Sequence, residues 1–157
     1  MNSALSRQQL IDNFCRQAGE VHVAVLAAAH ALERSLATTP QSANLRDWRT
    51  STGKEVRALI DCLRTHCIEA DSYGGLIQQI EFLQGHSEYL TRLEDAHRRV
   101  LAKAQLLLQD LEAAPPAATP SQWLRELGEL SSAVHEHEAS EIDVIYETFW
   151  RDPVGGD

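Results

Sequence analysis

The segment from Val134 to Val144 places a histidine and a glutamate inside an otherwise apolar helical stripe. His137 and Glu141 stand at positions i and i+4, which puts both side chains on the same face of a helix, one turn apart. A buried imidazole and a buried carboxylate are costly unless both are paired, and a metal ion would pair both. The pattern therefore predicts that His137 and Glu141 are metal ligands. The stripe itself steps by three and four residues through Trp123, Leu127, Leu130, Val134, His137, Glu141 and Val144.

Two further apolar stripes each contain one histidine, His66 or His97. His97 lies about 15 residues before the end of its helix and His137 about 17 after the start of the next, so at a rise of ~1.5 Å per residue the two are nearly level. We therefore predict that His66, His97 and His137 face one common axis. The stripe of His97 contains Leu90, Leu93, Val100, Ala104, Leu107 and Leu111, and that of His66 contains Val56, Leu59, Leu63 and Ala70.

The first helix offers two candidates for the same site, His22 and His30. At ~100° per residue, His22 lies about 60° from the centre of the apolar stripe and His30 more than 100° from it. His22 is also about 15 residues from the end of its helix, which at ~1.5 Å per residue matches the depth of His97, whereas His30 is only about 7 residues from that end. We prefer His22, and His30 stays as the alternative.

The stretches LRTHCIEAD, LEDAHRRVL and HEHEASEIDVI resemble the hemerythrin-like family, whose HHE-type domains bind non-haem iron. The family has one histidine per helix of a four-helix bundle and a carboxylate that follows the last histidine as H-x-x-x-E. The resemblance implies a di-iron centre that binds O2 or NO, for transport, sensing or redox protection. Carried over by matching residues, it implies the ligands His22 or His30, His66, His97, His137 and Glu141.

The chain departs from the family pattern at position 70, where a carboxylate is expected and Ala70 stands instead. Glu69 and Asp71 flank it, each about 100° from the centre of the stripe. Glu69 has the longer side chain, so we predict Glu69 as a ligand and keep Asp71 as the alternative. Leu93 and Leu101 stand where hemerythrin has a second histidine on the third helix. Four histidines and two carboxylates are ample for one iron and few for two, so both a mononuclear and a di-iron centre stay open.

Proline, glycine and capping residues divide the chain into four long helical segments, and no stretch alternates with the period of a strand. The lengths predict an all-α, antiparallel up-down-up-down four-helix bundle, in a single domain that spans residues 1–157. Gly53 leaves the start of the second helix open between Ser42 and Thr52. The predicted helices run from Ser6 to Ala37, up to Asp71, from Leu76 to Leu83 as a short piece, from Ser87 to Glu112, and onward from the cap at Thr119 and Pro120.

The composition excludes several classes of partner. Fourteen basic residues against 23 acidic ones give a net charge of −9, which opposes binding to nucleic acid and to anionic membranes. No apolar run approaches the roughly 20 residues that span a bilayer, and no secretory leader is evident, so we expect a cytoplasmic protein. The three cysteines form no C-x-x-C pair and are expected to be reduced.

The competing hypothesis is a metal-free helical module in which the histidines form a buried hydrogen-bond network. Such a module would bind another protein, and an apolar face left over on the first helix would permit a homodimer. His135 is two residues from His137 and so points to the opposite face, where we expect it to be exposed. Storage, sensing and enzymatic turnover are all compatible with a metal site of this kind.

Overall fold

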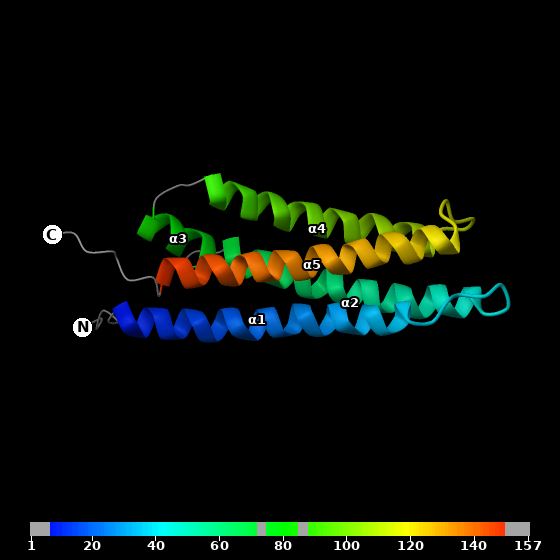
Figure 1. Ribbon diagram of the computed structural model, residues 1–157, viewed down its shortest axis with the longest axis horizontal. Coiled ribbons are helices and arrows are strands. Elements are labelled where there is room, and N and C mark those ends of the chain that lie inside the picture. Colours follow the sequence, from blue (N-terminus) through cyan, green and yellow to red (C-terminus); the bar gives the residue numbers. More distant parts are fainter. Residues whose placement is uncertain (1–6, 72–74, 85–87, 150–157) are drawn as a thin grey trace.

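The computed structural model of the protein describes residues 7–71, 75–84 and 88–149 (Figure 1). No strand occurs within these ranges, so the predicted all-α class is confirmed. The predicted starts at Ser6 and Ser87 lie outside the described residues. The helices are α1 (Arg7–Leu36), α2 (Leu45–Asp71), the short α3 (Leu76–Gln84), α4 (Glu88–Glu112) and α5 (Pro120–Phe149).

A side-chain cap marks the start of α5, and a backbone hydrogen bond marks the start of α2. At α5, the Gln122 amide accepts a hydrogen bond from the Thr119 N–H at 2.7 Å and the Thr119 hydroxyl accepts one from the Gln122 N–H at 3.3 Å, which is the predicted capping box. At α2, the Asn44 carbonyl accepts the first helical hydrogen bond, from the Trp48 N–H at 2.9 Å. The helix α2 therefore begins before Gly53, which lies in its interior.

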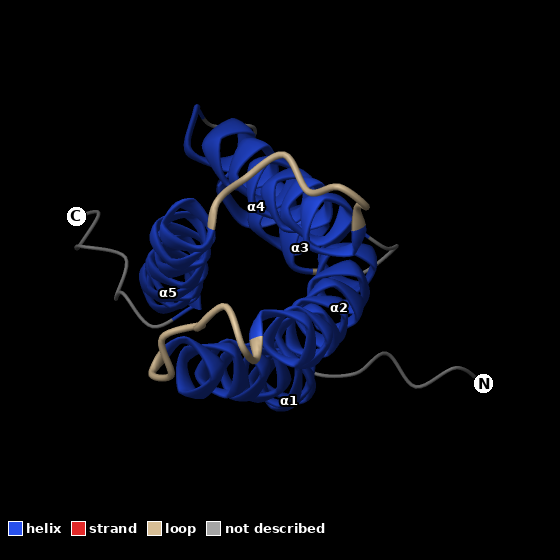
Figure 2. Ribbon diagram, turned by 90° about the vertical axis from the view of Figure 1, so that its right-hand side faces the viewer, coloured by secondary structure: helices blue, strands red, loops and turns tan. Residues whose placement is uncertain are grey.

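The four long helices surround a common centre, as the view along them shows (Figure 2). The helix α1 packs against α2 and α5, and α4 packs against the same two helices. The loop from α1 to α2 and the loop from α4 to α5 lie at the same end of the molecule (Figure 1). The short α3 packs at the other end, against α2, α4 and α5. Each long helix can therefore contribute side chains to one central site.

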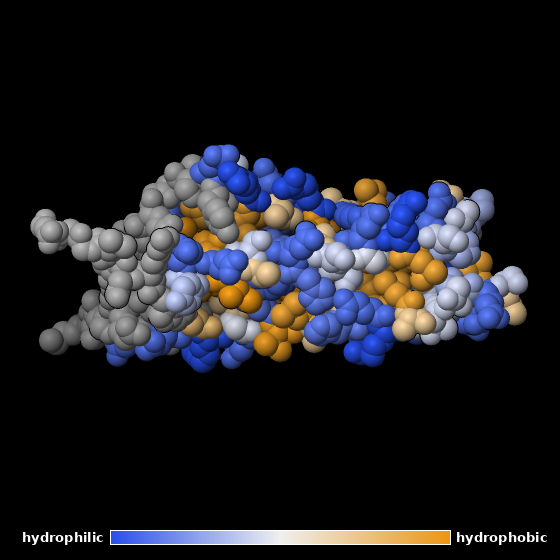
Figure 3. Space-filling view, viewed as in Figure 1, coloured by the Kyte–Doolittle hydropathy of each residue, from blue (hydrophilic) through white to orange (hydrophobic). Residues whose placement is uncertain are grey.

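Two apolar clusters fill the interior. The larger one contains Trp48 and Trp123, whose ring centroids are 6.2 Å apart, and the smaller one contains Ile80 of α3 and Leu90 of α4. Near the larger cluster, the Asp110 carboxylate accepts hydrogen bonds from the Trp123 indole at 2.6 Å and from two backbone N–H groups of the α4–α5 loop. The face shown in Figure 3 is largely hydrophilic, with smaller hydrophobic areas between.

Candidate metal centre

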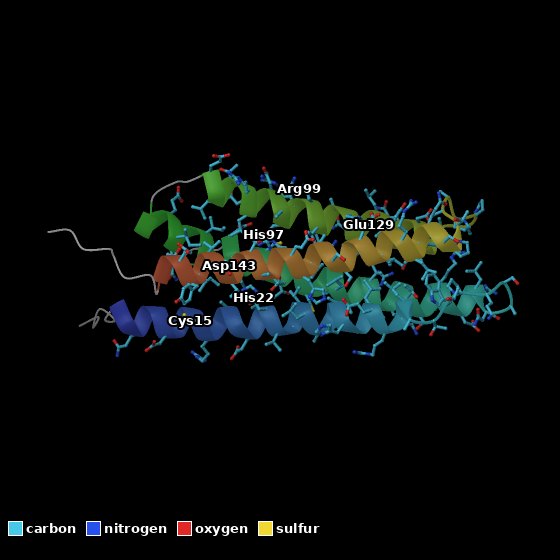
Figure 4. All side chains as sticks on the ribbon, in the orientation of Figure 1. Cys15, His22, His97, Arg99, Glu129 and Asp143 are labelled. Atoms are coloured by element: carbon cyan, nitrogen blue, oxygen red, sulfur yellow. The ribbon has the colours of Figure 1, made fainter. Side chains whose placement is uncertain are left out.

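A layer of buried polar side chains crosses the bundle between the two apolar clusters, and we call it the polar layer. On α2, His66 lies between Leu63 of the larger cluster and Ala70 of the smaller one. Figure 4 labels His22 on α1 and His97 on α4 at similar positions along the long axis. Apolar packing on both sides therefore fixes the height of the layer. Its members are His22, His66, His97, His137, Glu138 and Glu141.

Three histidines converge on the Glu141 carboxylate. The Nε2 atom of His66 lies 2.7 Å from Glu141 Oε2 and 3.1 Å from Nε2 of His97. The Nε2 atoms of His97 and His137 are each 3.6 Å from an oxygen of Glu141. One ligand atom from each of these four residues lies within 4.8 Å of the other three. These residues form the first ligand group, with three imidazole nitrogens and one carboxylate.

A second ligand group of the polar layer joins α1 to α5. His22 Nδ1 contacts Glu138 Oε2, and His22 Nε2 is 3.9 Å from Glu141 Oε2. His66 Nε2 is 3.9 Å from Glu138 Oε1. Ligand atoms of His22, His66, Glu138 and Glu141 again lie within 4.8 Å of one another. The two groups therefore share His66 and Glu141.

Much of the hydrogen-bonding capacity of the layer is unused. Among the described residues, no hydrogen bond reaches His97 Nδ1, either ring nitrogen of His137, Glu138 Oε1 or Glu141 Oε1. A buried polar atom left without a partner costs about 1–3 kcal/mol. A metal ion accepts electron pairs from ring nitrogens and carboxylate oxygens at once, so this donor set fits a bound cation.

The protonation states favour the same use. Burial, followed by the neighbouring His97, lowers the pKa of His137 to about 4, so its imidazole is neutral at pH 7. Burial raises the pKa of Glu141, but its contacts with His66 and His97 lower that pKa by more, so the carboxyl group is ionised. Burial lowers the pKa of His66, whereas Glu141, Glu138 and Glu69 together raise it by more, so His66 is the exception to this pattern. A neutral imidazole and an ionised carboxylate are the forms that ligate metals.

The structure brings together five of the six residues that the sequence singled out: His22, His66, His97, His137 and Glu141. Glu69 is exposed and belongs to neither ligand group, and its alternative Asp71 is exposed as well. His30, the alternative to His22, lies on the surface. The placements of His22 and His30 agree with the angular argument from the stripe.

Glu138 belongs to the polar layer, and the sequence reasoning missed it. Its side chain is 1% exposed, and it supplies from α5 the second carboxylate that was expected from α2. A signal was present, because Val134, Glu138, Glu141 and Ile145 also follow steps of four, three and four residues, and all are buried. The buried stripe of α5 is therefore wide enough to hold both His137 and Glu138.

None of the described helices combines the length and apolarity needed to cross a membrane. A buried cluster of histidines and glutamates that could hold a metal ion, in an all-helical fold, is compatible with the hemerythrin-like resemblance. The chain matches no family model, no curated protein and no solved structure with which it was compared.

Proposed function

We propose that this chain is a non-haem iron-binding, hemerythrin-like protein, built as an antiparallel up-down-up-down bundle and serving sensing, storage or redox protection. The observation that carries the proposal is the polar layer. Four histidines and two glutamates from the four long helices converge there, and several of their polar atoms make no hydrogen bond to the described residues. Iron held there supplies a coordination position for a diatomic ligand, O2 or NO.

The donor set supports iron over several other metals. Imidazole nitrogens suit iron, zinc, copper and nickel, whereas sites for magnesium and calcium consist of oxygen ligands. Neither ligand group contains a cysteine, which argues against an iron–sulfur cluster or Cu(I). The presence of two carboxylates beside the imidazoles favours iron over copper.

The residues of the chain bind the ion and exclude water. The six residues of the polar layer are at most 7% exposed, and the apolar clusters on both sides close the layer along the bundle axis. His22 also has a positioning role, because its contact with Glu138 Oε2 holds that carboxylate beside His66. The other oxygen of this carboxylate, Glu138 Oε1, makes no hydrogen bond to the described residues and is free to bind the ion.

The polar layer could hold one metal ion or two, because its two ligand groups share His66 and Glu141. One ion in the first group would use His66, His97, His137 and Glu141. A second ion would depend on His22 and Glu138, and Glu141 would have to serve both ions with its two oxygens. His97 and Glu138 each belong to only one group, so their variants separate the two cases.

The test is iron content per chain, measured by elemental analysis after loading with Fe2+ without oxygen and removal of unbound metal. We expect His97→Ala and His137→Ala to lose most of the iron. Glu138→Ala should lower the content from two to one if two ions bind, and leave one ion if only the first group is filled. Glu136→Ala, at an exposed position of the same helix, is the matched control. Unchanged iron content in both histidine variants would refute the site.

The second candidate is the metal-free module that binds a partner protein or forms a homodimer. The close contacts of His66 with Glu141 and of His22 with Glu138 favour it, because paired side chains of this kind also occur in structural networks. The two candidates differ in one thermal measurement. A ligand that binds only the folded state raises the melting temperature, so Fe2+ should stabilise an iron protein and leave the module unchanged.

A further inference from the structure

A second cluster of potential ligands lies on the surface where α1 and α5 meet. It consists of His30 and Glu33 on α1 and His135 on α5, and none of the three belongs to the polar layer. His135 Nε2 lies 2.8 Å from Glu33 Oε1, and the rings of His30 and His135 are 5.3 Å apart between centroids. One ligand atom from each residue lies within 4.8 Å of the other two.

The Glu33 carboxylate is held in place by a neighbour that is not itself a metal ligand. The hydroxyl of Ser131, a buried residue of α5, donates a hydrogen bond to Glu33 Oε1 at 2.6 Å. This bond and the one to His135 lower the pKa of Glu33, so the side chain is ionised. Hydrogen bonds of this type orient carboxylate ligands in metal sites. The two contributing helices are packed along each other, which fixes the positions of the ligands across the interface.

We propose that His30, Glu33 and His135 bind a divalent transition-metal ion that prefers imidazole, of the class of Zn2+. Two imidazole nitrogens and one carboxylate oxygen are ligands that zinc accepts, and three protein ligands leave a fourth position open. The side chains of His135 and Glu33 are 36% and 43% exposed, so the ion reaches this position directly from solvent. The site is separate from the proposed iron centre and does not depend on it.

His30 distinguishes this proposal from a simple ion pair. The contact between Glu33 and His135 needs no third residue, whereas a metal ion uses all three side chains. Removal of His30 should therefore abolish zinc binding at the surface while it leaves the pair of Glu33 and His135 intact. A chain that carries only an ion pair would bind zinc equally well with and without His30.

The experiment counts zinc ions per chain in the full-length protein by equilibrium dialysis against Zn2+ and elemental analysis. We expect His30→Ala and His135→Ala each to bind one zinc ion fewer than the unchanged protein. Ser131→Ala should keep the site and bind its zinc about 10-fold more weakly, because a group that orients a ligand is lost. Glu136→Gln, an exposed carboxylate on the same helix, is the control and should bind as the unchanged protein does.

A separate variant keeps this result apart from the iron centre. His97→Ala alters the first ligand group and should retain the surface zinc ion, whether or not the polar layer binds iron. Because the first ligand group also suits zinc, the double variant His97→Ala/His30→Ala is compared with His97→Ala alone. Loss of one zinc ion on adding His30→Ala, as in His30→Ala and His135→Ala alone, supports the surface site. Equal zinc content in the unchanged protein, His30→Ala and His135→Ala would overturn the proposal.

Discussion

Replacing His137 by leucine should stabilise the metal-free protein. The pKa of His137 is lowered to about 4 by burial and by His97, so the substitution at pH 7 removes a neutral side chain and no charge. Both ring nitrogens lack a hydrogen bond to the described residues, although the side chain is buried. Leucine is similar in size and has no polar atom to satisfy. If the layer exists to bind metal, this position is a source of instability until metal arrives.

The magnitude follows from the two unpaired nitrogens. One carries a proton and the other a lone pair, and each costs about 1–3 kcal/mol when buried without a partner. An imperfect fit of leucine in the packed core costs about 1–3 kcal/mol. We expect a net gain of about 1–3 kcal/mol, which in a chain of this size raises the melting temperature by about 2–4 °C per kcal/mol.

His22→Leu is the matched comparison and should have the opposite effect. His22 contacts Glu138, whose side chain is 1% exposed, so the substitution leaves a buried carboxylate without its partner. Breaking a buried pair in this way costs about 3–5 kcal/mol. Both variants replace a buried histidine of the polar layer by leucine, and they differ in whether the imidazole is paired.

The assay is urea unfolding of chelator-treated protein at pH 7, followed by circular dichroism. The unchanged protein should gain stability when Fe2+ is added, because the ion binds only the folded state, and His137→Leu should gain much less. A loss of stability in His137→Leu comparable to that in His22→Leu would refute the reasoning. It would show that His137 is paired in the metal-free protein and that the layer is a structural network.

Three further predictions concern other parts of the molecule. Asp110→Ala should lower the free energy of unfolding by about 1.5–3 kcal/mol at pH 7. Desolvation raises the pKa of Asp110, but its hydrogen bonds lower that pKa by more. The stability that Asp110 contributes is therefore present above the unfolded-state pKa of about 3.9 and is lost as the pH falls through the folded-state pKa. Urea unfolding at pH 7 and pH 3 measures this loss. Gly53→Ala should raise the free energy of unfolding by about 0.5–1 kcal/mol, because the added Cβ meets only Leu108 Cδ1, at 3.8 Å, and thermal unfolding measures the gain. Burial and Asp71 raise the pKa of Cys67 to about 11. The smaller thiolate fraction at pH 8 outweighs the higher nucleophilicity of that thiolate, so iodoacetamide should alkylate Cys67 about 10-fold more slowly than a free thiol of pKa ~8.5, as mass spectrometry would show.

The helices were predictable because their signals are local. The capping box of Thr119 and Gln122 marked the start of α5, and the apolar periodicity placed His66, His97 and His137 on buried faces. The start of α2 was not predictable, because Gly53 has a poor intrinsic preference for helix. In the structure, Gly53 is buried in the interior of α2 and lies beside Leu108 of α4, so tertiary packing overrides that preference.

The carboxylates of the candidate site were harder to predict than the histidines. Periodicity gives the direction of a side chain to within about one residue, or ~100° of rotation, and does not give the width of the buried stripe. On α2 the inward position belongs to Ala70, so Glu69 is turned to the surface. On α5 the stripe covers two adjacent positions, and Glu138 is buried beside His137. The width of each buried stripe depends on how the neighbouring helices pack against it, and the sequence of a single helix does not contain that information.

The energetic cost of the polar layer argues for a bound ion. Five buried polar atoms of the layer make no hydrogen bond to the described residues. Glu141 Oε2 is not counted among them, because it lies 2.7 Å from His66 Nε2. At about 1–3 kcal/mol each, such atoms cost as much as the entire net stability of an ordinary domain, about 5–15 kcal/mol. A structural network would pair these atoms with one another, because paired polar groups are what stabilise a core. A cation coordinated by one nitrogen of His137 and by Glu141 Oε1 would remove the part of this cost that those two atoms carry, and the surrounding apolar clusters hold its ligands in place whether or not the ion is bound.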